Sequence, residues 1–93
     1  MLFRSFSSAN LRGAKLNGAR LLRAELCYAN LVCADLTCAD LTGANLGDTD
    51  LLLASFDGAN LSGVYLVGAR LDGVDFSGAD MGIEGYRLVR NDD

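Results

Sequence analysis

A large apolar side chain occupies every fifth position along most of this chain, and the spacing is unbroken from residue 4 to residue 83. Taking each of these side chains as the centre of a five-residue unit gives sixteen consecutive units. None of the centres is polar; they are Phe6, Leu11, Leu16, Leu21, Leu26, Leu31, Leu36, Leu41, Leu46, Leu51, Phe56, Leu61, Leu66, Leu71, Phe76 and Met81. Such a regular internal repeat has to be interpreted before any single helix or strand is considered.

The positions around each centre repeat as well. Two residues before the centre, twelve of the sixteen residues are Ala; the residue between is Asn or Asp in nine units, and the residue two after is Gly in eight. An α-helix is excluded because five residues advance about 140° around its axis, which leaves no continuous apolar stripe. The Ala and the centre are two residues apart, which is the spacing of side chains on one face of an extended strand.

Glycine marks where these short extended pieces turn. In the segment Leu61-Ser62-Gly63-Val64, Gly is the third of four residues, the position at which a type II turn requires a positive φ. Extended pieces alternating with corners describe a coil with the Ala and Leu/Phe rows inside. The sequence therefore predicts an all-β solenoid.

The units resemble those of the pentapeptide-repeat family, whose consensus is A-(D/N)-L-X-X, over about 80 of the 93 residues. The resemblance implies a right-handed quadrilateral β-helix with four units, or 20 residues, per coil and about four coils in all. It is also typical of bacterial proteins, cyanobacterial ones especially.

Charge gives a separate indication of the number of walls, because like charges should not stack on neighbouring coils. With residues twenty apart in contact, Lys15 stacks on Asp35, Arg20 on Asp40 and Asp50 on Arg70. A three-walled coil of fifteen residues would instead stack Asp35 on Asp50 and Glu25 on Asp40. The four-walled interpretation is therefore favoured.

The repeat also sets the expected domain organisation. Residues 1–3 form an N-terminal end segment, residues 4–83 the β-helix, and residues 84–93 a cap followed by a mobile tail. Arg4 stands where a small buried residue is expected, which indicates an open first corner. Ile83, Tyr86, Leu88 and Val89 are expected to cover the last coil, either as a helical turn or as an incomplete coil.

The net charge of −4 is distributed unevenly along the chain: the first 23 residues carry +5 and the remaining 70 carry −9. This gradient is either an ordinary solvated surface or an axial dipole that orients a partner or favours head-to-tail stacking.

The longest apolar run, Leu51 to Ala54, is far too short to cross a membrane, and the N-terminus lacks the apolar region of a signal peptide. Three cysteines without pairing geometry indicate a reducing compartment. We therefore expect a cytoplasmic protein with no membrane partner, unless a leader peptide has been removed.

The outward positions of the middle coils are unusually apolar. They predict an exposed strip on one face, and we expect it to form a protein interface made of Tyr28, Val32, Cys33, Leu52, Leu53 and Val67. The alternative is that stacked aliphatic side chains only cover the backbone. A homodimer through this strip or through the coil ends, or a different protein partner, would fit the first interpretation.

The chain offers little that could support catalysis. It has no His, its carboxylates are spaced regularly along a surface, and its glycines follow the five-residue period, which argues against a phosphate-binding loop. Cys33 and Cys38 lack further metal ligands. No enzyme activity, cofactor or metal is expected.

Two functions remain. The first is a structural or protein-interaction module that presents flat walls to an undefined partner. The second follows from resemblance to the quinolone-resistance members of the family, acidic rods that mimic DNA and bind DNA gyrase; they form longer rods than this chain can. Direct nucleic-acid binding is not expected, since the basic cluster is small and has no interleaved aromatics.

Overall fold

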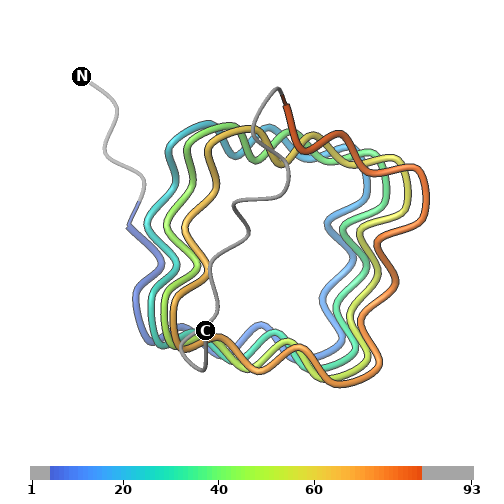
Figure 1. Cartoon of the computed structure of the whole chain (residues 1–93). Coiled ribbons are helices and arrows are strands. Elements are labelled where there is room, and N and C mark those ends of the chain that lie inside the picture. Colours follow the sequence, from blue (N-terminus) through green and yellow to red (C-terminus); the bar gives the residue numbers. More distant parts are fainter. Residues whose placement is uncertain (1–4, 83–93) are drawn as a thin grey trace.

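The computed structural model describes residues 5–82, and these form a tube of square outline (Figure 1). Followed from blue to red, the chain runs counter-clockwise in Figure 1 while it approaches the viewer, which is the sense of a right-handed coil. The predicted end segment, Arg4 and the predicted cap and tail lie outside the described residues.

The turns of the tube are joined by parallel β-bridges between residues twenty apart, from Ser5 with Glu25 to Asn60 with Asp80. Residues 5–82 contain no helix and no continuous strand, because each wall contributes one bridging residue before the chain turns again. Backbone hydrogen bonds accompany each bridge: Leu31 donates to the Asp50 carbonyl at 2.8 Å, and the Asp50 N–H donates to the Ala29 carbonyl at 3.1 Å.

The bridges confirm the pairs expected from charge. Lys15 lies beside Asp35, Arg20 beside Asp40, and Asp50 beside Arg70. Inside the tube the same period appears in the rings of Phe56 and Phe76, which stack with centroids 5.5 Å apart and planes 4° apart. One circuit therefore takes twenty residues.

Each corner is closed by a hydrogen bond from the residue three after a centre to the carbonyl of that centre, as from the Ala9 N–H to the Phe6 carbonyl at 2.9 Å. The residue two after the centre has a positive φ at every corner from Ser8 to Gly78, and the residue before it does not. This is the expected type II pattern. Seven of these positions are not Gly, so the conformation is imposed by the stack as well as by residue choice.

The core consists of the two inward rows. Most of the Ala and Leu/Phe side chains between residues 24 and 61 are at most 1% exposed, and Phe56 is completely buried. Burying one Leu or Phe side chain contributes about 1.5–3 kcal/mol, so these rows supply most of the stability. Thr49 replaces Ala in the buried row and donates its hydroxyl to the Leu46 carbonyl at 2.7 Å, which satisfies the buried group.

Candidate interaction surface

One wall of the tube is bordered on both sides by exposed apolar side chains. We call it the Arg70 wall; it comprises residues 9–11, 29–31, 49–51 and 69–71. Its outward column is polar and consists of Asn10, Asn30, Asp50 and Arg70, joined by bridges.

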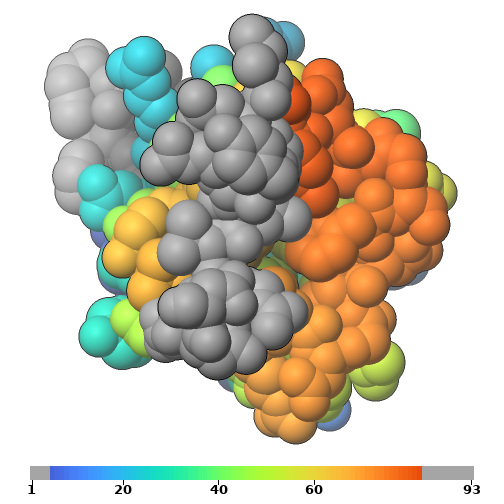
Figure 2. Space-filling view, in the orientation of Figure 1, coloured from blue at the N-terminus to red at the C-terminus, as the bar shows by residue number. Residues whose placement is uncertain are grey.

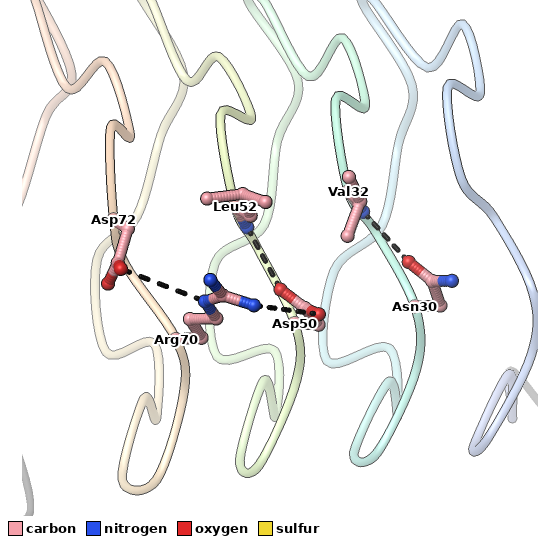
Figure 3. A network of polar contacts seen from close by, with 6 residues as sticks. All are labelled: Asn30, Val32, Asp50, Leu52, Arg70 and Asp72. Carbon is pink, nitrogen blue, oxygen red and sulfur yellow. Dashed lines mark hydrogen bonds and ion pairs between the residues drawn. The ribbon is translucent and has the colours of Figure 1, made fainter.

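The side chains of this column hold the wall and the following corner together (Figure 3). Oδ1 of Asn30 and of Asp50 accepts the backbone N–H two residues ahead, at 3.1 and 3.2 Å. Arg70 forms ion pairs with Asp50 at 3.8 Å and with Asp72 at 3.7 Å. These pairs are solvent-exposed, so each stabilises the fold by at most about 1 kcal/mol.

The corner before the Arg70 wall, which we call the Tyr28 corner, comprises residues 7–8, 27–28, 47–48 and 67–68. Tyr28 is 65% exposed there, and Val67 is half-buried. The ring of Tyr65 lies over Gly47, with its nearest atom 3.0 Å from the place where a β-carbon on Gly47 would be. Gly47 therefore gives room for a second aromatic side chain at this corner, and Tyr65 is itself 52% exposed.

The corner after the wall, which we call the Leu53 corner, comprises residues 12–13, 32–33, 52–53 and 72–73. Leu53 is 57% exposed and adopts a φ of 61°. Its Cδ2 lies 2.6 Å from the place where a β-carbon on Gly73 would be, so the absence of a side chain at Gly73 accommodates it. Cys33 is exposed beside it, and Leu52 is half-buried.

The structure changes the predicted strip in two respects. Val32 is only 5% exposed, so the expectation that it lies on the surface is wrong; it is enclosed within the stacked column between Arg12 and Leu52. The remaining residues do not form one continuous strip, because Tyr28 and Val67 are separated from the Leu53 corner by the polar column of the Arg70 wall. That these residues form an interface stays a prediction.

Tyr65 was missed by the sequence analysis. It occupies the outward row in which nine of sixteen residues are Asn or Asp, and a bulky aromatic side chain in that row was the available signal.

The Asn and Asp side chains of the outward row have a local structural use. All nine of them accept a backbone N–H two residues ahead through Oδ1, at distances of 2.8–3.2 Å. These bonds close an Asx turn ahead of each corner. Asp35, Asp40, Asp75 and Asp80 are among these turn-closing residues.

Three of these carboxyl groups have a lowered pKa. The pKa of Asp35 falls below its ordinary value of 3.8 because the Thr37 hydroxyl and then the Thr37 N–H donate to the carboxylate. Thr42 lowers the pKa of Asp40 in the same way, and Ser77 lowers that of Asp75. The hydrogen bonds at the corners therefore favour the ionised form of these three carboxyl groups.

Cys27, Cys33 and Cys38 are free thiols, and the Cys27 sulfur lies 3.4 Å from the Ser7 hydroxyl. Cys33 and Cys38 occupy successive corners. Between residues 5 and 82 no group of three or more His, Cys, Asp or Glu side chains is arranged to hold a metal ion. The same part of the chain contains no helix long and apolar enough to cross a membrane.

The family model for pentapeptide repeats, with eight copies, matches residues 5–37, 34–73 and 54–82. The chain belongs to the pentapeptide-repeat family. Members of this family with solved structures form right-handed quadrilateral β-helices, in agreement with the tube described above.

Two solved pentapeptide-repeat proteins are similar over 82% of this chain. One, Rfr23 from the cyanobacterium Cyanothece 51142, is 32% identical with a TM-score of 0.81, and 52% of its length is covered. The other, from Nostoc PCC 7120, is 34% identical with a TM-score of 0.52, and 63% of its length is covered. The chain thus spans between about half and two thirds of these proteins. No curated protein matches it.

Proposed function

We propose that this pentapeptide-repeat protein is a non-enzymatic interaction module, a β-helix of about four coils that binds a protein partner through the Arg70 wall and its two corners. The observation that carries the proposal is the exposure of three side chains, each more than half exposed. Tyr28 and Leu53 lie in the two corners beside this wall, and the ring of Tyr65, from the adjoining wall, lies over Gly47 of the Tyr28 corner.

Side chains of this kind are suited to binding. Tyr contributes a large contact area at a low cost in side-chain entropy and is frequent among the residues that dominate binding energy. Arg70, Asp50 and Asp72 supply polar groups between the two corners, which suits a site with apolar anchors and charged surroundings. The closed ladder of bridges keeps these residues in fixed positions, which lowers the ordering cost of association.

The proposal places the protein in the cytoplasm, since a reducing compartment suits its three free thiols.

The test compares the proteins captured by the immobilised chain with those captured by a Tyr28→Ser, Leu53→Ser double variant. We expect partners held by the unmodified chain to be lost or reduced more than tenfold, as is typical when two buried anchors are removed. The matched control is Leu22→Ser, because Leu22 is 45% exposed at a corner that does not border the Arg70 wall. If the double variant and the control capture the same proteins in the same amounts, the proposed site is wrong.

A second candidate function is that of an acidic DNA mimic that binds DNA gyrase. It is favoured by two adjoining walls whose outward columns end in acidic residues, Asp35, Ser55 and Asp75 on one and Asp40, Asn60 and Asp80 on the other. Lys15 and Arg20 begin these same columns and interrupt the acidic surface. Inhibition of gyrase supercoiling by the purified chain would support this function, and unchanged supercoiling at a large molar excess would exclude it.

A further inference from the structure

We propose that copies of this chain associate head to tail, with the last turn of one copy stacked on the first turn of the next so that the columns of the tube continue in register. The proposal concerns the ends of the tube and is independent of the lateral site. It rests on the incompletely buried core side chains at the two ends of the tube, on the opposite charge of these ends, and on the single orientation that the charges favour.

At both ends of the tube, several core side chains are less completely buried than those in the middle. Phe6 is 40% exposed and Leu11 and Leu16 are half-buried at the first turn, whereas the equivalent Leu31 and Leu36 are completely buried. At the other end Leu71 and Phe76 are half-buried, although Leu66 of the same turn is only 1% exposed. Figure 2 views the tube from this end, with the last described turn in orange and red. Stacking would place Leu71 on Leu11 and Phe76 on Leu16 of the next copy.

The two ends carry opposite charge. The first turn holds Arg12, Lys15, Arg20 and Arg23 and no acidic residue, whereas the last described turn holds Asp72, Asp75, Asp80 and one basic residue, Arg70. Two first turns or two last turns brought together would therefore repel each other, while a first turn and a last turn attract.

Charge also selects the rotation between the copies. If the twenty-residue step of the bridges continues across the junction, Asp75 meets Lys15, Asp80 meets Arg20, and Arg70 meets the neutral Asn10 of the next copy. Asp72 then meets Arg12 at the corner. This orientation gives two acid–base pairs in the outward row and no pair of like charge.

The other three rotations of a square tube are poorer. Rotating the next copy by one wall in one direction, or by two walls, places Arg70 beside Lys15 or Arg20. The remaining rotation forms only the pair of Asp80 with Lys15. The in-register orientation is further favoured because Lys15 already lies beside Asp35 of its own copy, so that basic and acidic side chains would alternate through the junction.

The backbone can continue in the same way. Within the tube, each centre donates its N–H to the outward residue of the next turn, as Leu51 does to the Arg70 carbonyl at 3.0 Å. At the junction the equivalent bonds would run from Leu71 and Phe76 to the carbonyls of Asn10 and Lys15 of the next copy. The surface at the first turn differs from the surface at the last turn, and stacking along the tube axis never returns to the first copy. The product is therefore an open row of copies instead of a closed dimer.

The experiment is sedimentation velocity of the full chain over a range of protein concentrations, at about 0.1 M and about 1 M salt. We expect the sedimentation coefficient to rise with protein concentration and to continue beyond the value of a dimer. The association should weaken at the higher salt, where the screening length is about 3 Å. An Asp75→Asn, Asp80→Asn variant should raise the dissociation constant about tenfold at the lower salt, because two ion pairs per junction are lost.

The variants separate an effect on the junction from effects on folding and on net charge. Asn retains the Oδ1 acceptor that Asp75 and Asp80 offer to Ser77 and Gly82, so the turns remain closed. The matched control is Asp48→Asn, Asp57→Asn, which removes the same charge from exposed corner positions of the middle of the tube, away from Lys15 and Arg20, and it should leave association unchanged. The Tyr28→Ser, Leu53→Ser variant should also still associate, which separates this junction from a lateral dimer.

A monomer at every concentration would overturn the proposal. Equal weakening by the Asp75/Asp80 variant and its control would overturn it too, since the effect would then be one of net charge. A discrete dimer abolished by the Tyr28/Leu53 change would place self-association at the lateral site instead.

Discussion

At the scale of single residues, the Asn and Asp side chains of the outward row act first as turn caps and only then as surface charge. Each accepts the N–H two residues ahead, and the hydroxyl of Thr42 adds a second bond of 2.7 Å to Asp40. Asn and Asp offer the same Oδ1, which explains why the row accepts either residue. Whether a position holds Asn or Asp therefore affects the charge of the wall and the pH dependence of stability, but not the geometry of the turn.

This leads to a prediction for acid stability. Because the pKa values of Asp35, Asp40 and Asp75 are lowered in the folded chain, the unfolded chain binds more protons just below pH 3.8. Their contribution to stability is complete above that pH and is lost as the pH falls through the folded values. Changing all three to Asn should flatten the fall in the free energy of unfolding in this range, measured by urea denaturation from about pH 7 downward.

The control for this measurement is Asp48→Asn, Asp57→Asn, which removes two corner carboxylates outside the capping row. If the control flattens the acid dependence as much as the triple variant does, the capping bonds are not its cause.

At the scale of the repeating element, the corner requires a positive φ whether or not Gly is present. Gly occupies eight of the fifteen described positions from residue 8 to residue 78, and the non-Gly residues are concentrated in the middle of the tube. There, neighbouring turns on both sides hold the backbone by hydrogen bonds, as for Cys38, whose N–H donates to the Asp57 carbonyl at 2.9 Å. The stack thus supports a conformation that L-residues adopt at a cost.

Cys38→Gly should therefore stabilise the protein. Cys38 has a φ of 59° and is the one non-Gly residue in a corner column with Gly18, Gly58 and Gly78. We expect a gain of roughly 0.5–1 kcal/mol in the free energy of unfolding, because the strain of about 1–2 kcal/mol is relieved while the unfolded chain becomes more flexible.

The matched control is Asp57→Gly, one residue before a corner glycine, where φ is not positive. It should destabilise the protein by roughly 0.5–1 kcal/mol. A loss of stability in Cys38→Gly comparable to that of the control would mean that the corner is not strained.

At the scale of the whole molecule, the tube could be predicted from the sequence because its core follows one strict period. Sixteen apolar centres in register leave few ways to bury them, and the charged pairs such as Asp50 with Arg70 favour four walls over three. The candidate site could be predicted only in part. The exposure of an outward side chain depends on the residues stacked above and below it. Val32 is therefore buried, whereas Leu53, which occupies the neighbouring column of the same corner, is exposed.

The square tube requires that residues twenty apart lie side by side on the same wall. This requirement is tested most directly by paramagnetic spin labels on engineered cysteine pairs, in a chain whose three native cysteines are replaced by Ser. Labels at Asp35→Cys and Ser55→Cys sit on bridged residues, with backbones about 4.8 Å apart, and should show strong dipolar broadening. Labels at Asp40→Cys and Ser55→Cys, on adjoining walls, should show little, whereas stronger broadening in this second pair would indicate a fifteen-residue, three-walled tube and contradict the account.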